Sequence, residues 1–315
     1  MHCPHLNELP IPPSKKIGWP WTEESSVLPD KMPNGDIWPK ISIVTASYNQ
    51  GQFIEETIRS ILLQGYPNLE YIIVDGGSSD NSIEIIKKYE NWLYYWVSEP
   101  DNGQSHALNK GFERATGEIF AWLNSDDYYQ RDALRNIIIF RNNNLNFIAW
   151  VGACYDIDKT GKLLRKRFPR VGNKRQFGNW GEDKDAWIGQ PACFFDAHTF
   201  KRINGIDERL NYVLDVDLWM RLADHGKFIS TDQVLSFDRK YPEIKSYYDK
   251  PMQQAEHIFI AFNQGLPQVA RKRMVECRDI SLSSMSYKDI CILFLKRSIR
   301  LIINNFKKVC NRLNV

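Results

Sequence analysis

The stretch GEIFAWLNSDDY, residues 117–128, carries an apolar run that stops at two adjacent carboxylates. Residues 119–123 form an uninterrupted apolar segment of strand length, which is typical of a strand covered on both faces in a parallel sheet. The following Asn-Ser favours a turn, so Asp126 and Asp127 are expected at the carboxyl edge of that sheet, where open α/β folds bind ligands. Taken alone, the pair is explained more simply by a solvated loop or a helix N-cap. The surrounding segments decide between these interpretations.

Three similar units precede this stretch, and each combines a β-branched or aromatic run, a polar turn and a segment with apolar residues at helical spacing. The predicted strands lie at 41–46, 69–74 and 93–97, and the predicted helices at 53–62, 83–89 and 103–115. This alternation of strand and helix indicates a parallel sheet with crossover helices. All four strand ends then meet at one edge of the sheet, and this convergence favours a ligand site over a solvated loop.

Downstream of residue 130 the pattern is weaker. It predicts a helix at 132–140, strands at 147–155 and 192–195, a short helical turn ending at 205, a helix at 214–222, and two short strands at 228–230 and 234–237. Residues 168–185 show no periodicity and are expected to form a long loop, which in a compact domain is usually functional or mobile.

Composition excludes several classes of protein. The 315 residues carry a net charge of +3, which is too small to indicate a nucleic-acid partner. The six cysteines are scattered without a CxxC pair, which predicts reduced thiols in the cytoplasm rather than a disulfide framework or a zinc site. Neither a signal peptide nor an uncharged apolar stretch of about 18 residues is found, so no membrane span is expected.

The two ends of the chain differ from its middle. Residues 1–40 hold eight prolines together with Trp19, Trp21 and Trp38. They are expected to form an extended arm that docks through its tryptophans, or else a flexible tail. Residues 287–313 place apolar side chains on one helical face and most Lys and Arg on the others. This basic amphipathic helix predicts contact with an anionic membrane surface, with packing on the protein itself or on a second subunit as the alternative.

Five blocks of the chain, in this order and at this spacing, resemble family 2 glycosyltransferases of the bacterial polysaccharide-biosynthesis type. They are ISIVTASYNQGQFIEETIRSILLQ (41–64), YIIVDGGSSDNS (71–82), SEPDNGQSHALNKGFERATGEIFAWLNSDDYY (98–129), GQPACFF (189–195) and LDVDLWMRL (214–222). The resemblance covers roughly residues 41–240. It implies a GT-A fold, an α/β fold with a Rossmann-like, mostly parallel central sheet flanked by helices.

On the donor side, the resemblance implies that the strand ends hold the nucleotide of a nucleotide-sugar. The implied nucleotide-binding residues are Thr45, Ala46, Ser47, Asn49, Asp75, Asp101 and Asp126. Asp127, together with Asp126, matches the family's metal motif and would ligate Mg²⁺ or Mn²⁺ at the diphosphate. A carboxylate at Asp75 suits the N3–H donor of uracil, which favours a UDP-sugar. The family often has a second acid where Gly76 stands, so the identity of the base stays open.

On the acceptor side, inversion by direct displacement needs one general base across the anomeric carbon from the leaving group. Asp215 matches the family's base, with Leu214 where Glu is usual, and Asp217 is the second candidate. The residues implied near the acceptor or donor sugar are Gln190, Pro191, Trp180 and Trp219. Many relatives carry a His where only Lys240 and Tyr241 are found here, so no third metal ligand is assigned.

The sequence thus predicts an inverting hexosyltransferase (EC 2.4) that moves a sugar from a nucleotide-diphosphate donor to a saccharide or lipid-linked acceptor. We expect an arm (1–40), a catalytic domain (41–245, donor half 41–130, acceptor and base half 131–245) and a helical C-terminal extension (246–315). The expected location is the cytoplasm, peripheral on the inner face of the plasma membrane. The alternative is a membrane-associated nucleotide-sugar-binding protein without catalysis. A nicotinamide-dependent enzyme would need GxGxxG after the first strand, which is not found.

Overall fold

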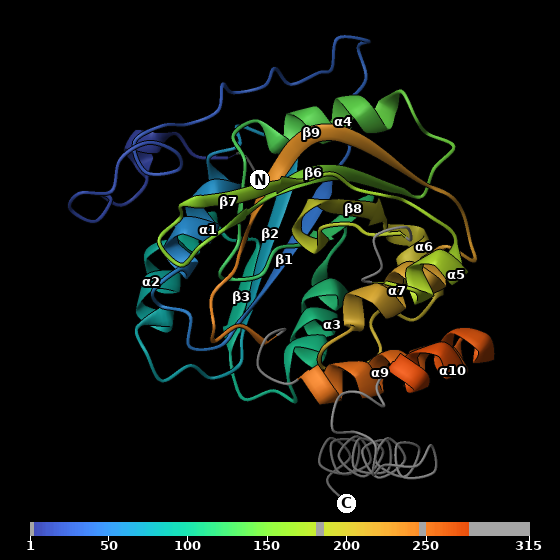
Figure 1. Ribbon diagram of the computed structural model, residues 1–315. Coiled ribbons are helices and arrows are strands. Elements are labelled where there is room, and N and C mark those ends of the chain that lie inside the picture. The colour runs from blue at the N-terminus through green and yellow to red at the C-terminus, as the bar shows by residue number, and fades with distance from the viewer. Residues whose placement is uncertain (1–2, 181–185, 246–249, 277–315) are drawn as a thin grey trace, which may run out of the picture.

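The computed structural model describes residues 3–180, 186–245 and 250–276 (Figure 1). Its strands are β1 (Ile41–Ser47), β2 (Leu69–Asp75), β3 (Tyr95–Ser98), β4 (Ile119–Trp122), β5 (Tyr128–Tyr129), β6 (Ala149–Ile157), β7 (Leu163–Arg167), β8 (Cys193–Asp196) and β9 (Phe228–Arg239). Its α-helices are α1 (Ile54–Leu62), α2 (Ser82–Lys88), α3 (Gln104–Arg114), α4 (Ala133–Asn142), α5 (Lys174–Gly178), α6 (Ala197–Arg202), α7 (Leu214–Leu222), α9 (Lys250–Asn263) and α10 (Pro267–Glu276). The helix expected over 287–313 lies outside the described residues.

Within the described ranges, nine strands form one mixed sheet in the order β3-β2-β1-β4-β8-β6-β9-β5, with β7 paired to β6. β1 to β4 run parallel, and Ser47, Asp75 and Ser98 stand opposite one another at the ends of β1, β2 and β3. β8 pairs antiparallel with both β4 and β6 and so joins the second half of the chain to the same sheet. The predicted α/β fold with a central sheet flanked by helices is confirmed.

Two apolar layers cover the two faces of the sheet. On one face, α1, α2 and α4 pack on residues such as Ile43 of β1. On the other face, α3, α6 and α7 pack on residues such as Val44. Adjacent residues of β1 are therefore both buried, which explains the continuous apolar runs in the sequence. Gly111 allows α3 to approach β1 closely, because a Cβ at this position would lie 2.3 Å from Val44 Cγ1.

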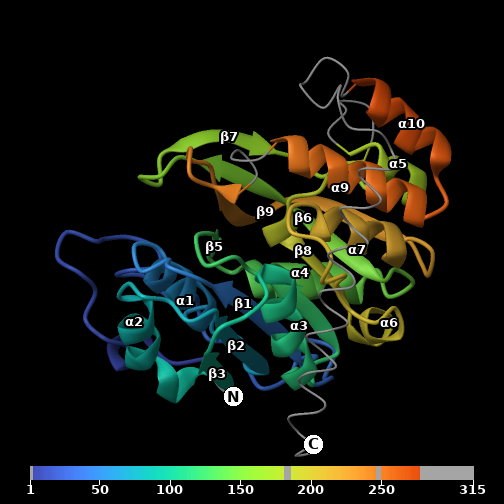
Figure 2. The same ribbon diagram turned by 90° about the horizontal axis from the view of Figure 1, so that it is seen from below.

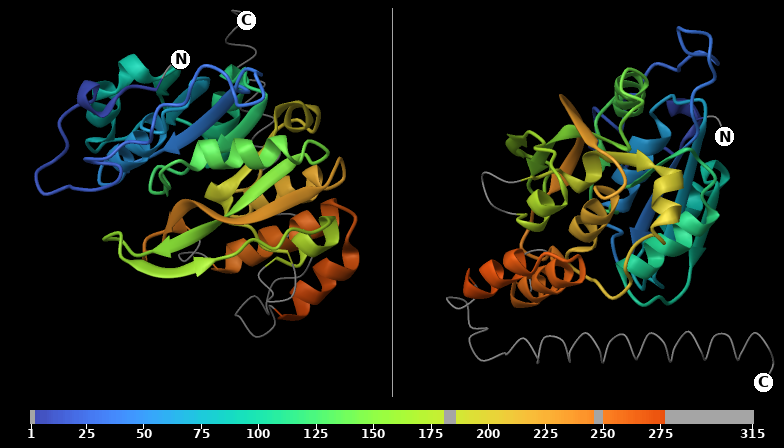
Figure 3. Two further views of the ribbon diagram at one scale, coloured as in Figure 1. Left: turned by 90° about the horizontal axis from the view of Figure 1, so that it is seen from above. Right: turned by 90° about the vertical axis from the view of Figure 1, so that its right-hand side faces the viewer.

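The proline-rich arm packs against α1 on the first of these faces. Trp21 and Trp38 keep only 5% and 2% of their surface exposed. The fully buried Arg59 of α1 donates hydrogen bonds to three backbone carbonyls of the arm, those of Pro10, Pro20 and Trp21. At the opposite end of the described chain, α9 and α10 form a helical pair on the side of the molecule away from the arm (Figure 2 and Figure 3). None of the described helices is long and apolar enough to cross a bilayer.

Two predictions for the second half of the chain are corrected. The two short strands expected at 228–230 and 234–237 are one strand, β9, whose pairing with β6 shifts register twice. These irregularities interrupt the alternation of side chains that a continuous strand would show. The loop expected over 168–185 contains the short helix α5. Asn173 begins this helix by accepting a hydrogen bond from the backbone N–H of Gln176, and α5 is too short for apolar periodicity to reveal it.

Candidate active site

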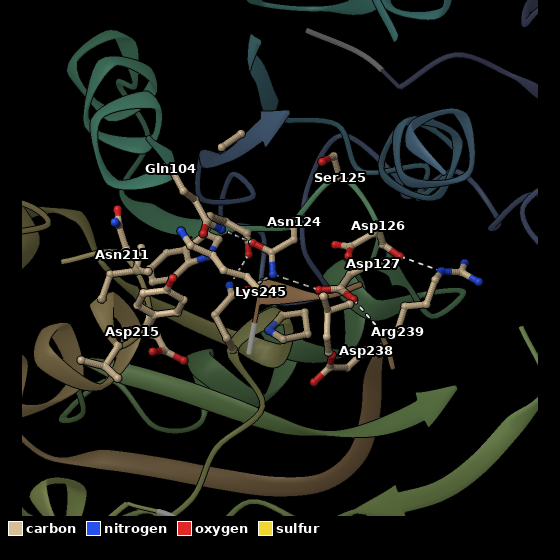
Figure 4. Close-up of a pocket in the computed structure, with 18 of the residues that line it drawn as sticks. Gln104, Asn124, Ser125, Asp126, Asp127, Asn211, Asp215, Asp238, Arg239 and Lys245 are labelled. Atoms are coloured by element: carbon tan, nitrogen blue, oxygen red, sulfur yellow. Dashed lines mark hydrogen bonds between the residues drawn. The ribbon is translucent and has the colours of Figure 1, made fainter. Parts of the chain in front are cut away.

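A cavity of about 1110 Å³ opens at the carboxyl ends of β1 and β4. The turn after β4, the start of α7 and the segment after β9 contribute further parts of its wall. In Figure 4, Asp126, Asp127 and Asp238 lie on one side of the cavity, and Asp215 lies across from them. Residues far apart in the sequence therefore bring four carboxylates to one space.

The turn after β4 presents the carboxylate pair. The backbone N–H of Asp127 donates to the carbonyl of Asn124, which closes the turn directly after the strand. Asp127 is buried, and its carboxylate accepts from Asn124 Nδ2 (3.1 Å) and from the backbone N–H of Arg239 (2.8 Å). Asp126 Oδ2 accepts from the hydroxyl of Tyr241 (2.8 Å). Both carboxylates are thus held by groups of the segment after β4 or of the end of β9.

The electrostatics of this pair suit a bound cation. Burial, together with the neighbouring charges of Asp238 and Asp126, raises the pKa of Asp127 well above its usual value. Burial, with a further contribution from Asp238, also raises the pKa of Asp126. Buried carboxylates that repel one another would be stabilised as anions by a divalent ion, which prefers oxygen ligands. The donor set therefore fits Mg²⁺ or Mn²⁺.

Arg239 fixes the position of the turn that carries the pair. Its side chain is almost completely buried, and its Nε donates to the carbonyl of Asp126 (2.9 Å). Its Nη2 forms an ion pair with Glu56 of α1 (2.7 Å), and Glu56 also accepts from Trp21 Nε1 of the arm (3.2 Å). One guanidinium group therefore connects the turn after β4 with helix α1, and through Glu56 with the arm.

Asp215 lies in the first turn of α7, in the cavity wall. Burial is the main reason why the pKa of its carboxyl group rises to about 6. Asp217, two positions along the same helix, is not among the lining residues of the cavity. It forms an ion pair with Arg221 (2.7 Å) and accepts from Gln264 Nε2 (3.1 Å). Of the two candidate bases, the structure brings only Asp215 to the cavity.

The predicted donor-binding residues divide into two groups. Ala46, Ser47, Asp101 and Asp126 line the cavity, whereas Thr45, Asn49 and Asp75 do not. The Asp75 carboxylate accepts hydrogen bonds from the backbone N–H groups of Gly77 and Ser78 and from Ser98 Oγ, so its own turn and the end of β3 occupy it. Asn49 Oδ1 accepts from Ser79 N (2.8 Å), and Thr45 Oγ1 accepts from the Tyr71 hydroxyl (3.2 Å).

The residues expected near the sugars also divide. Gln190, Pro191 and Trp180 line the cavity, and Trp219 does not. Trp219 is fully buried behind the wall, stacked on Trp122 with ring centroids 5.6 Å apart. Gln190 Oε1 accepts from Asn124 Nδ2 (3.0 Å), which connects this segment to the carboxylate turn. Three lining residues that the sequence did not indicate are Asp238, Arg239 and Arg167, which come to the cavity only through the pairing of β6, β7 and β9.

A cavity at the strand ends of an α/β sheet, with a carboxylate pair on one side and a carboxyl group of raised pKa on the other, has the chemistry that a phosphorylated ligand and its cation require. Comparison with known proteins identifies the family. Residues 42–198 match the family model "Glycosyl transferase family 2", and the chain belongs to this family of transferases.

Three curated relatives illustrate the range of similarity. A glycosyltransferase of Mycobacterium tuberculosis is 35% identical over 186 residues, which cover 59% of this chain and 69% of the relative. A glycosyltransferase of Rickettsia typhi is 27% identical over 263 residues, 82% of this chain and 80% of the relative. The putative teichuronic acid biosynthesis glycosyltransferase TuaG of Bacillus subtilis is 38% identical over 105 residues, 32% of this chain and 42% of TuaG.

Solved structures share the fold at low sequence identity. The structure of S. aureus TarS 1-349 in complex with UDP-GlcNAc superposes with a TM-score of 0.60 at 17% identity, over 78% of this chain and 74% of that one. The mannosyltransferase PcManGT from Pyrobaculum calidifontis, in complex with GDP-Man and Mn²⁺, superposes with a TM-score of 0.54 at 18% identity, over 89% and 84%. At this identity the likeness establishes the GT-A fold.

Proposed function

We propose that the chain is an inverting glycosyltransferase that uses a nucleotide-diphosphate sugar, a divalent cation and Asp215 as the single general base. The observation that carries the proposal is that Asp215 lies across one cavity from Asp126 and Asp127 (Figure 4). A base on one side and a diphosphate site on the other is the arrangement that direct displacement with inversion requires.

In the proposed reaction, the acceptor hydroxyl loses its proton to Asp215. The hydroxyl oxygen forms a bond to the anomeric carbon as the bond to the diphosphate breaks on the opposite face. A pKa of about 6 leaves the carboxylate ionised at neutral pH and more basic than an ordinary aspartate. Asp127 and Asp126 would hold the metal, which when bound neutralises charge on the departing diphosphate. Asn124 and Arg239 keep both carboxylates in place.

For the donor, we propose a UDP-sugar, and Asp101 as the carboxylate nearest the nucleoside. Asp75 is occupied by its own turn, whereas Asp101 lines the cavity. A Cβ at Gly76 would lie 2.7 Å from Asp101 Oδ2, so Asp101 fills the space in which the family's second acid would start. TarS was solved with UDP-GlcNAc, in keeping with a uridine donor, whereas the GDP-Man of PcManGT is the competing choice.

For the rest of the chain, we propose the division into an arm (1–40), a donor half (41–130), an acceptor and base half (131–245) and a C-terminal extension (246–315). The acceptor is proposed to be a saccharide or lipid-linked glycan of polysaccharide biosynthesis, as the name of the relative TuaG suggests. Residues 287–313 are proposed to hold the enzyme on the inner face of the plasma membrane. Co-sedimentation with anionic liposomes should be lost when the chain is cut before residue 287, and equal binding would contradict the anchor.

Activity measurements test the assignment of base and metal site. The full chain is incubated with Mn²⁺ and UDP- or GDP-sugars, and nucleotide release and transfer are measured. Asp215→Asn and Asp127→Ala should each reduce transfer by about 10²-fold or more, because a base or a metal ligand is lost. Asp217→Asn is the matched control on the same helix and should retain turnover. Full transfer by Asp215→Asn would show that the base is a different residue.

The alternative is a nucleotide-sugar-binding protein without catalysis. It would bind the donor with a raised melting temperature and release no nucleotide with any acceptor. The cavity position of Asp215 and its raised pKa favour the enzyme, because a binding protein has no use for a base across from the diphosphate.

A further inference from the structure

Arg167, the last residue of β7, faces the cavity with its guanidinium group stacked on an indole. Its Cζ lies 3.4 Å from the centroid of the Trp187 ring, and both residues line the cavity. Trp187 is held in place because its backbone N–H and carbonyl both pair with Arg170 (2.8 and 2.6 Å). Among the described residues, the Arg167 guanidinium donates no hydrogen bond, and its single ion pair, to Asp156, is long (3.8 Å). The group is therefore fixed in orientation while its donors remain available.

The carboxylates nearest Arg167 each have a closer cationic partner. Asp156 has a closer partner in Arg165, whose Nε lies 2.6 Å from Oδ2. Asp238 is paired with Lys240 at 2.6 Å. In this group of two carboxylates and three cations, Arg167 is therefore the cation without a close anion.

The location of Arg167 indicates which substrate it meets. The carboxyl ends of β1 and β4 and the carboxylate pair occupy the donor side of the cavity. Arg167 comes from the end of β7, with Trp187 and Trp180, whose rings lie 6.1 Å apart, and all three line the same cavity as Asp215. The charge of Asp238 acts on both Arg167 and Asp215. An acceptor that presents its hydroxyl to Asp215 would therefore extend toward Arg167.

We propose that Arg167, stacked on Trp187, binds an oxyanion group of the acceptor, so that the enzyme selects a glycan carrying a carboxylate or a phosphate. A planar guanidinium with free N–H groups forms paired, charge-assisted hydrogen bonds with either group. This inference rests on the proposed function, because it names the substrate class of the same site. A uronic acid and a sugar phosphate are the two sources of such an oxyanion.

Three acceptors of one shape separate these possibilities: p-nitrophenyl glucoside, p-nitrophenyl glucuronide and p-nitrophenyl glucoside 6-phosphate. The full chain with Mn²⁺ and its nucleotide-sugar should use at least one anionic acceptor about tenfold better than the neutral one, mainly through KM, as expected for a charged hydrogen bond. The anionic acceptor with the higher kcat/KM shows whether the oxyanion that Arg167 binds is a carboxylate or a phosphate. Arg167→Gln should bring the anionic-to-neutral ratio of kcat/KM close to one, and Arg167→Lys should keep part of it.

Lys166→Gln is the matched control, since Lys166 is the neighbouring cation on the same strand, lies over the Phe168 ring and is not a lining residue. It should leave the anionic-to-neutral ratio unchanged. A binding experiment without turnover, calorimetry of the three glycosides in the presence of UDP, separates this inference from the proposed function. A preference for an anionic glycoside that Arg167→Gln abolishes supports the inference even if no sugar is transferred. The inference is overturned if the wild-type chain binds all three alike, or if Arg167→Gln weakens all three equally.

Discussion

In the turns after β2 and β3, carboxylates are bound by the backbone of their own turns. Asp75 accepts from the N–H groups of Gly77 and Ser78, two and three residues away, and Asp101 accepts from the N–H of Gly103. The wall formed by the carboxylate turn and the end of β9 is different. Asp127 accepts from the backbone of Arg239, 112 residues away, and Asp126 accepts from Tyr241, 115 residues away.

This difference shows which contacts position the side chains in each half of the site. A turn with short hydrogen bonds forms as soon as its strand ends, and it needs no distant partner. The carboxylate pair is positioned only when β9, α1 and the arm are all in place, because Arg239 reaches Glu56 across 183 residues. A substitution that breaks the distant contacts should therefore lower the stability of the whole fold. A substitution within one of the turns should have only a local effect.

The largest effect is expected for Arg239→Met. The change leaves Glu56 without its ion pair and removes the donor to the carbonyl of Asp126. Breaking a buried pair on one side typically lowers the free energy of unfolding by about 3–5 kcal/mol. Urea denaturation followed by circular dichroism measures this loss in the free energy of unfolding.

Arg131→Met provides the matched comparison. Arg131 pairs with Glu23 of the arm at 3.5 Å, but both side chains are about half exposed. Removal of such a surface pair should change the free energy of unfolding by less than about 1 kcal/mol. If Arg239→Met and Arg131→Met lowered the free energy of unfolding equally, the buried, long-range ion pair of Arg239 would be no more important for stability than the exposed pair of Arg131.

The same distinction explains what the sequence could predict. The strands and helices of the first half were found because each pattern lies within one contiguous stretch, and the edge position of Asp126 and Asp127 followed from the end of β4. The single strand β9 and the role of Arg239 depend on pairing between distant strands and left no local signal. Asp75 is a contrasting case: its position at a strand end followed from the sequence, but the sequence did not show that its carboxylate accepts the N–H groups of Gly77 and Ser78.

A smaller effect, dependent on pH, is expected for Asp215→Asn. The folded-state pKa of about 6 lies above the unfolded value of about 3.9, so the folded protein loses stability as the pH rises through about 6. The asparagine variant does not carry this charge. It should match the wild type near about pH 4 and exceed it by up to about 3 kcal/mol at about pH 8.

Urea denaturation at the two pH values measures this difference, and Asp224→Asn is the control. Asp224 is partly exposed and pairs with Lys174 on the surface, so its replacement should change the free energy of unfolding by less than about 1 kcal/mol. A wild type that is more stable than Asp215→Asn at the higher pH would mean that a positive partner, rather than burial, dominates at Asp215.

The smallest effect is expected for Ser98→Ala, which removes one hydrogen bond from the turn at Asp75. Ser98 Oγ donates to Asp75 Oδ2 at 2.7 Å, but that oxygen keeps the N–H groups of Gly77 and Ser78. The carboxylate therefore stays satisfied, and the loss should be about 1 kcal/mol. Thermal unfolding measures the loss, and the KM for the nucleotide-sugar should stay within about twofold of the wild-type value if the turn holds without Ser98. A large loss of donor binding would mean that the end of β3 helps to position the nucleotide-sugar. The turn at Asp75 would then depend on contacts between strands as strongly as the carboxylate pair depends on Arg239.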